Sequence, residues 1–249
     1  LNNLAYVRFL QQQLDEAIEL YEESLAIKEQ LSLDFPQQRK YAEDLALGLI
    51  NQGSLMERLG RLEPAEVYTR RANERYDHLI STYPSRPDCR ELHASALLNL
   101  GTIVLRQGRE EEAETQFGKA IVGLKQLAHQ YPESFSYAQM LSAGLEKLGD
   151  LEREHGNLVQ AVQRYTEAIA AVETHHQAQP DSIPVNNRLM NGLIARATVR
   201  AWMADYDQSL EDWDRAIELS IPAARDGWRL ARGTTLMRAG RYVEAIAQA

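Results

Sequence analysis

Asparagine side chains recur at one register of this sequence and could hydrogen-bond to a peptide. They stand 48 positions apart, at Asn3, Asn51 and Asn99. Asparagine is a poor helix former, so its repetition in helical segments indicates a role other than helix stability. Its amide carries donors and an acceptor together, which suits the backbone of an extended peptide. The sequence therefore predicts a row of amides that binds peptide backbone, with local hydrogen bonding as the alternative. Lys147 occupies the same register in the following copy.

Arginines follow two of these asparagines by seven positions, at Arg58 and Arg106. A guanidinium forms paired hydrogen bonds with a carboxylate, so both residues predict a preference for acidic peptides. Glu57 adjoins Arg58 and would dilute its charge, and the alternative is a solvated polar face. Trp202 occupies the same register in a later copy. Its ring is expected either to anchor an interface or to pack on the next copy. Two more aromatic residues are candidates for this face: Tyr6 and Phe9.

The residues typical of a catalytic site are missing from this sequence. It has no glycine-rich phosphate loop, and its histidines share neither a repeat register nor a metal-ligand spacing. Cys89 is the only cysteine, so the chain can form neither an internal disulfide nor a cysteine-based zinc site. We therefore predict a protein that is not an enzyme and that has no cofactor and no metal site.

Charge and hydropathy restrict the class of partner. The 249 residues carry a formal net charge of −9, which argues against nucleic acid because phosphate binding needs a basic surface. The sequence contains no run of 18 apolar residues, so it predicts no membrane-spanning helix. The sequence opens at Leu1 without a basic and apolar leader, and we expect a fragment of a longer cytoplasmic protein. The expected partner is a protein or peptide, with acidic character.

The elements that must position these residues come from a repeat with a period of 48 positions. Small side chains mark its register in five copies: Ala17, Ala65, Ala113, Ala161 and Ser209. In the second copy, apolar spacing predicts one helix over about 38–59 and another over about 63–82. Gly60 lies between them, where the end of a helix favours positive φ. Gly53 and Ala65 would let these two helices approach closely.

This pattern resembles the tetratricopeptide repeat. The third copy has that family's relative spacings at Leu100, Gly101, Ala113, Phe117 and Ala120, with Pro132 delayed by about seven positions. The usual repeat is about 34 residues long, so each copy here is longer by about 14, which two extra turns on each helix would supply. The resemblance implies an all-α, right-handed superhelical solenoid of antiparallel helix hairpins. We expect a single array of five and a half copies over residues 1–249: 1–36, 37–84, 85–132, 133–180, 181–228 and a partial 229–249.

The resemblance also implies a function. The first helices of tetratricopeptide-repeat arrays line a concave groove that commonly binds peptides, and in kinesin light chains asparagines at this register follow the bound peptide. We therefore predict a scaffold for protein–protein interaction that binds a peptide or partner helix in its groove. Residues 35–72 also look like the arrays that follow the kinase domain in many bacterial serine/threonine protein kinases. The alternative prediction is a domain of such a protein that forms homodimers or regulates the parent chain.

Two further surface features are expected. The fourth copy carries five charged residues at helical spacing, which predict ion pairs within their own helix: Glu146, Lys147, Asp150, Arg153 and Glu154. The partial sixth copy lacks a polar capping helix, so the C-terminal copy should expose apolar surface.

Overall fold

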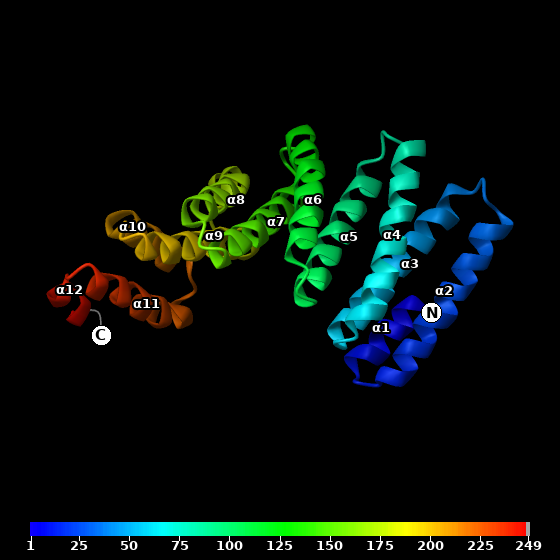
Figure 1. The fold of residues 1–249 in the computed structure, drawn as a ribbon, viewed down its shortest axis with the longest axis horizontal. Coiled ribbons are helices and arrows are strands. Elements are labelled where there is room, and N and C mark those ends of the chain that lie inside the picture. The colour runs from blue at the N-terminus through cyan, green and yellow to red at the C-terminus, as the bar shows by residue number, and fades with distance from the viewer. Residues whose placement is uncertain (248–249) are drawn as a thin grey trace. The chain divides into compact units, whose positions relative to one another are not determined.

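Residues 1–247 are described by a computed structural model, in which all regular structure is helical (Figure 1). Residues 248 and 249, the last two of the predicted partial copy, lie outside the described residues. The elements are, in order, α1 Asn2–Leu10, α2 Leu14–Asp34, α3 Arg39–Arg58, α4 Leu62–Thr82, α5 Pro87–Arg106, α6 Glu110–Gln130, α7 Phe135–Glu154, α8 Leu158–Ala178, α9 Ile183–Trp202, α10 Tyr206–Leu219, the 3-10 helix η1 Pro222–Ala224, α11 Arg225–Arg238 and α12 Tyr242–Ile246.

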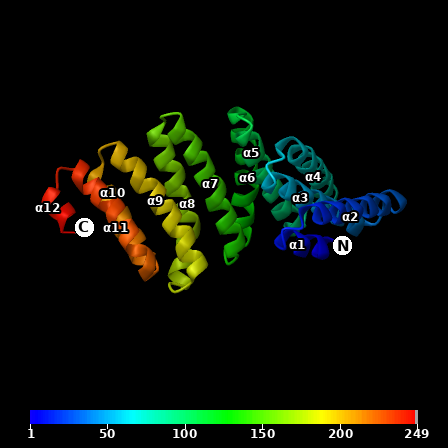
Figure 2. The ribbon, with the colours of Figure 1, turned by 90° about the horizontal axis from the view of Figure 1, so that it is seen from below.

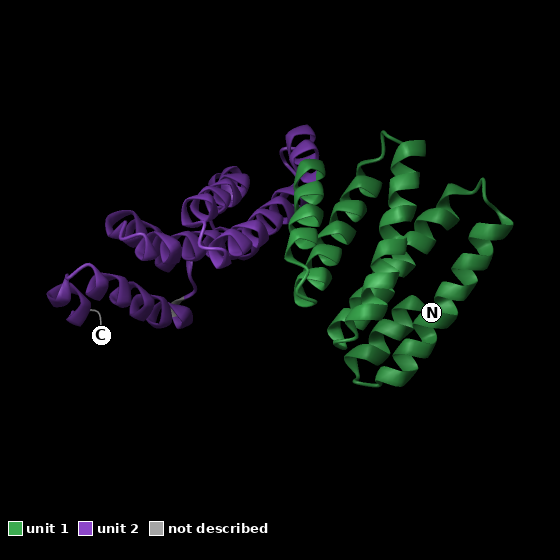
Figure 3. Cartoon of the chain, in the orientation of Figure 1, with its two compact units in different colours: residues 1–123 green, residues 124–249 purple. Residues whose placement is uncertain are grey.

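The helices form two compact units, residues 1–123 and residues 124 onward, with the boundary inside α6 (Figure 3). Within each unit, consecutive helices pack side by side, such as α3 with α4 and α7 with α8 (Figure 2). First helices of neighbouring copies also touch, α3 with α5 and α7 with α9. This pairwise packing confirms the prediction of an all-α helical-repeat solenoid.

Helix lengths repeat along the chain. The four helices α3, α5, α7 and α9 have 20 residues each, and their first residues stand 48 positions apart in the numbering. Their partners α4, α6 and α8 have 21 residues each. A helix of this length spans about 30 Å, which accounts for the extra residues relative to the usual repeat.

Small residues stand where the two helices of a hairpin cross. A Cβ atom added at Gly101 would lie 2.5 Å from the ring of Phe117, and one at Gly149 would lie 2.7 Å from the ring of Tyr165. Both aromatic rings are fully buried. The expectation that glycine permits close helix approach is therefore confirmed, and the aromatic ring from the second helix occupies the space that a side chain would take.

The turn inside each hairpin uses one backbone conformation. Four glycines there have φ between +73° and +79°: Gly60, Gly108, Gly156 and Gly240. Gln12 and Ala204 occupy the same turn in the first and fifth copies, with φ of 62° and 60°. Glycine adopts this left-handed region without steric cost, whereas a residue with a Cβ atom is strained there.

Replacing Ala204 by glycine should therefore stabilise the protein. Relief of the left-handed strain, partly offset by the greater freedom of glycine in the unfolded chain, should raise the free energy of unfolding by about 0.5–1 kcal/mol. Urea denaturation measures this change. Ala170→Gly is the matched control, because Ala170 is exposed within α8 and glycine there should cost about 1 kcal/mol. Equal effects of the two substitutions would contradict the assigned turn strain.

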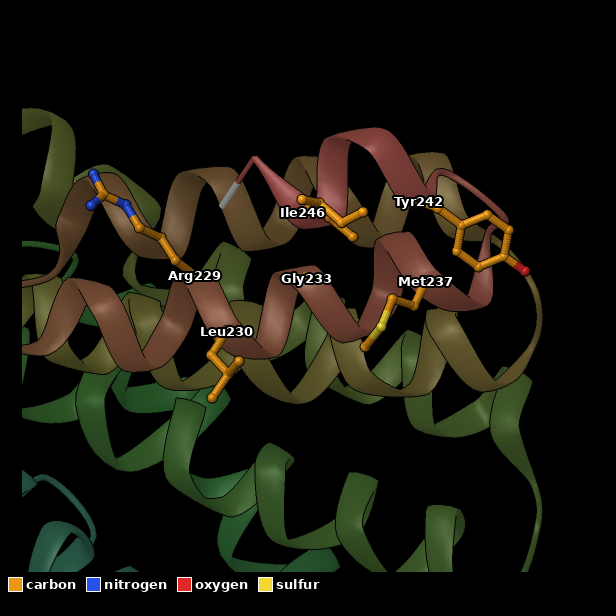
Figure 4. A pocket seen from close by; sticks show the side chains of 7 residues that line it. Arg229, Leu230, Gly233, Met237, Tyr242 and Ile246 are labelled. Atoms are coloured by element: carbon orange, nitrogen blue, oxygen red, sulfur yellow. The ribbon is translucent and has the colours of Figure 1, made fainter. Parts of the chain in front are cut away.

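The last copy exposes apolar side chains, as the sequence predicts. A pocket of about 350 Å³ lies between α11 and α12 (Figure 4). Its exposed apolar residues are Leu230, Met237, Tyr242 and Ile246. A Cβ atom added at Gly233 would meet nothing within 4 Å, unlike those at Gly101 and Gly149. The structure therefore confirms an uncovered apolar face on α11.

One part of the surface differs from expectation. Arg153 pairs with Asp150 at 3.2 Å within α7, as predicted. Glu146 instead forms an ion pair with Arg188 of α9. The prediction that all these charges pair within their own helix is wrong for Glu146, because first helices of neighbouring copies touch. Across residues 1–247, no helix has both the length and the apolar character needed to cross a membrane.

Candidate functional site

A pocket of about 250 Å³ opens on the first unit among α1, α2 and α3. Two of the residues singled out in the sequence, Asn51 and Arg58, lie in its wall, one near the middle and one at the end of α3. The complete lining is Tyr6, Phe9, Tyr21, Asn51, Ser54, Leu55 and Arg58. The pocket thus combines an aromatic wall from α1 and α2 with polar groups from α3.

Arg58 is the charged group of this pocket. Its guanidinium carbon lies 5.6 Å from the centroid of the Phe9 ring, a cation–π distance. Arg58 is exposed, and among residues 1–247 it has no carboxylate partner. Its positive charge therefore faces the pocket without compensation from the protein.

Tyr21 forms the floor beside this charge. Only 8% of the residue is exposed, and burial is the main cause of its raised pKa. The nearby Tyr6 also raises that pKa, whereas Arg58 lowers it. Tyr21 consequently remains a neutral phenol at physiological pH, able to donate a hydrogen bond rather than to repel an anion.

Asn51 and Asn99 lie on neighbouring first helices. Asn51 is half-buried in the pocket wall, and Ser54 follows it by three positions on the same helix. The amide nitrogen Nδ2 of Asn99 lies 3.5 Å from Oγ of Ser54, at the upper limit for a hydrogen bond. The local contact given as the alternative role is therefore present for Asn99, but it is weak.

Arg106 is already paired. Its Nη1 donates to the backbone carbonyl oxygen of Glu57 at 3.3 Å and to Glu57 Oε1 at 3.2 Å. Glu57 thus pairs with Arg106 and not with the adjacent Arg58. Glu57 turns toward α5, because the two first helices touch, and it neutralises Arg106 instead.

The remaining candidates lie elsewhere. Asn3 is exposed on α1 and is not part of the pocket wall. Lys147 and Trp202 belong to the second unit, on α7 and at the end of α9, and 49% of Trp202 is exposed. The structure therefore brings together Asn51 and Arg58, places Asn99 and Arg106 on the adjacent α5, and leaves the other three apart from the pocket.

Several pocket residues were missed by reasoning from the sequence. Tyr21 is absent from the candidates that the sequence provides, yet it lines the pocket. Ser54 and Leu55 were not considered for binding, although Ser54 follows Asn51 at helical spacing and could have been found by that signal. Tyr6 and Phe9 do lie on this side, as expected.

Two segments of the chain match family models described as tetratricopeptide repeat, residues 1–36 and residues 69–132. These two segments support a tetratricopeptide-repeat array. No curated protein sequence matches it. The array places its polar candidates on first helices, α3 and α5.

Solved structures share the fold of the array. BtubC (BKLC) from P. vanneervenii has a TM-score of 0.70 and 16% identity, over 95% of this chain and 88% of that one. The apo form of RapI has a TM-score of 0.66 and 12% identity, over 98% and 82%. Pseudomonas aeruginosa pilF has a TM-score of 0.54 and 18% identity, over 84% and 74%. At these identities the likeness shows the fold alone.

Proposed function

We propose that this tetratricopeptide-repeat array is a non-enzymatic scaffold for protein–protein interaction that binds an acidic peptide in the groove formed by its first helices. The observation that carries the proposal is Arg58, an exposed guanidinium without a carboxylate partner among the described residues, at the mouth of an aromatic pocket. An unpaired arginine beside aromatic rings can bind a carboxylate and an adjacent apolar side chain together.

Each group of the pocket has a role in this proposal. Arg58 binds a carboxylate of the peptide, while Phe9 and Tyr6 contact the neighbouring apolar side chain. Asn51 exchanges hydrogen bonds with the peptide backbone, and Asn99 does so after giving up its weak contact with Ser54. Because all these groups lie on packed helices, little conformational entropy is lost on binding.

The other candidate residues take lesser parts. Arg106 contributes less than Arg58, because a ligand carboxylate would have to compete with Glu57 for it. Asn3 is proposed as a peptide contact of the first unit outside the pocket, and Lys147 and Trp202 are proposed as separate peptide contacts of the second unit.

The binding test compares peptides that differ in one charge. Peptides that carry Glu or Asp beside Leu or Phe are compared with counterparts in which Gln or Asn replaces the acidic residue. We expect the wild type to prefer the acidic peptides and Arg58→Gln to bind them roughly 10- to 100-fold more weakly, since a hydrogen bond to a charged group contributes about 1.5–3 kcal/mol. Fluorescence anisotropy measures the affinities.

Arg75→Gln is the matched control for this test. It removes the same charge from an exposed arginine of α4 that lines a different pocket of the same unit. It should leave peptide binding unchanged. Equal affinities of the wild type and Arg58→Gln, or equal binding of acidic and amide peptides, would exclude the assigned role of Arg58.

A second candidate function is self-association, or regulation within a larger bacterial protein such as a serine/threonine kinase. The exposed apolar residues between α11 and α12 favour it, because uncovered apolar surface of this kind often marks an interface (Figure 4). Light scattering over a range of concentrations separates the candidates. A monomer at every concentration would exclude self-association.

A further inference from the structure

Lys28 of α2 occupies a register that the next three copies fill with core residues. Those residues are fully buried: Tyr76, Leu124 and Val172. Lys28 itself is half-buried. An ammonium group that leaves water at such a register loses hydration, which is unfavourable unless another group compensates its charge. The position of Lys28 therefore indicates a role for its charge and not only for its methylene groups.

The side chain of Lys28 packs against Gly48 of α3. A Cβ atom added at Gly48 would lie 3.1 Å from both Cδ and Nζ of Lys28. A side chain at this place on α3 would thus displace the ammonium group. The glycine therefore leaves the space in which the end of Lys28 lies, and the ammonium group is held beside the backbone of α3.

No carboxylate of the first unit neutralises Lys28 directly. Among residues 1–247, Lys28 has neither an ion pair nor a side-chain hydrogen bond. Asp44, one turn before Gly48, forms its ion pair with Lys40 at 3.4 Å instead. Burial lowers the pKa of Lys28, and the charge of Asp44 offsets this effect only in part. The ammonium group is thus partly desolvated without a carboxylate in contact with it.

Lys28 lies on the continuation of the peptide-pocket wall along two helices. On α2, Tyr21 lines the pocket, and Lys28 follows it by seven positions, which places both on one face of the helix. On α3, Asn51 lines the pocket, and Gly48 precedes it by three positions, as a neighbour on the helix surface. Lys28 is therefore on the same side of the first unit as the pocket, at the end away from Arg58.

We propose that Lys28 binds a second carboxylate of the peptide, so that the preferred ligand carries two acidic residues at a defined spacing. This inference rests on the proposed binding of an acidic peptide by Arg58 and adds what else that peptide must contain. A carboxylate at Nζ would favour the charged form of Lys28 and compensate its lost hydration. Because Gly48 already holds the ammonium group in place, little side-chain entropy is lost on binding.

The geometry of α3 sets the spacing of the two acids. Gly48, which marks the place of the ammonium group, and Arg58 are ten positions apart. This separation corresponds to a rise of about 15 Å along the helix. An extended peptide advances about 3.3 Å per residue, so its two acidic residues should stand about four to five residues apart.

Peptides with two glutamates test this spacing. The first glutamate stands beside leucine, as in the ligand proposed for Arg58, and the second is placed on either side at a series of separations up to about eight residues. We expect the tightest binding at a separation of about four to five residues. There, replacement of the second glutamate by glutamine should weaken binding roughly tenfold, because a hydrogen bond to a charged group is lost. Fluorescence anisotropy measures the affinities.

Lys28→Met tests which group binds the second glutamate. Methionine suits a register that is buried in the next three copies, so this variant should fold, and circular dichroism verifies it. In Lys28→Met the second glutamate should no longer improve binding, whereas binding through the first should still require Arg58. Lys119→Met is the matched control, because it removes the same charge from an exposed lysine of α6 in the same unit. It should keep the preference for the second glutamate.

The outcomes separate this inference from the proposed function. If peptides bind through Arg58 but gain nothing from a second glutamate, the inference is wrong and the proposed function stands. The same conclusion follows if Lys28→Met retains the full gain. If no acidic peptide binds the folded wild type, both are wrong.

Discussion

Asp212→Ala should destabilise the second unit by about 3–5 kcal/mol, because it leaves two largely buried arginines without their shared carboxylate. Arg196 donates Nε and Nη2 to Asp212 at 2.9 and 2.6 Å, and Arg200 donates Nη1 at 2.7 Å. The three side chains are 13%, 5% and 14% exposed for Arg196, Asp212 and Arg200. Thermal and urea denaturation of the chain measure the loss.

Two further variants test the cause of this loss. Asp207→Ala removes a carboxylate that is 94% exposed and should change stability by less than about 1 kcal/mol. The triple variant Arg196→Leu, Arg200→Met and Asp212→Leu replaces all the buried charges by apolar groups and should recover most of the lost stability. If Asp212→Ala is as stable as the wild type, the cluster is not stabilised by this carboxylate.

Gly101→Leu should destabilise the first unit by about 1–3 kcal/mol or more through overpacking. A Cβ atom at this position would lie 2.5 Å from the Phe117 ring, and Phe117 is fully buried, so the ring cannot move into solvent without exposing apolar surface. Chemical denaturation monitored by circular dichroism measures the change in the free energy of unfolding.

Gly118 supplies the matched control for this substitution. It lies within α6, directly after Phe117, and a Cβ atom added there would meet nothing within 4 Å. Gly118→Ala should raise stability by up to about 1 kcal/mol, because alanine favours a helix. An unchanged free energy of unfolding for Gly101→Leu would show that α5 and α6 do not cross at Gly101.

Most of the fold could be predicted because the apolar positions that define each helix and the small residues at the helix crossings repeat with the same period. The fixed period predicts the helices, and α3 and α4 begin and end close to the predicted bounds. Gly60 marks its turn correctly, and Gly108, Gly156 and Gly240 adopt the same conformation in the other copies. The positive φ of Gln12 and Ala204 could not be predicted, because a residue with a Cβ atom disfavours this conformation. Tertiary packing holds both residues in the turn despite that preference.

The candidate site was predictable only in part. Asn51 and Arg58 share one face of one helix, so their spacing already predicts that they lie together. Glu57 is the counterexample, because it adjoins Arg58 in sequence but binds Arg106 of the next first helix. Tyr21 comes from another helix, and nothing in its local sequence places its ring beside Arg58.

The sequence by itself determined the helical repeat, its register and the amide and guanidinium groups of α3. The tertiary structure decided which charges are neutralised and which remain free, because ion pairs such as that of Glu57 with Arg106 form between helices of successive copies. The same holds for Cys89. Its place in the sequence indicates no partner, yet packing of α3 against α5 brings Oε1 of Glu43 to 3.6 Å from its sulfur, because these residues meet in space and not along the chain.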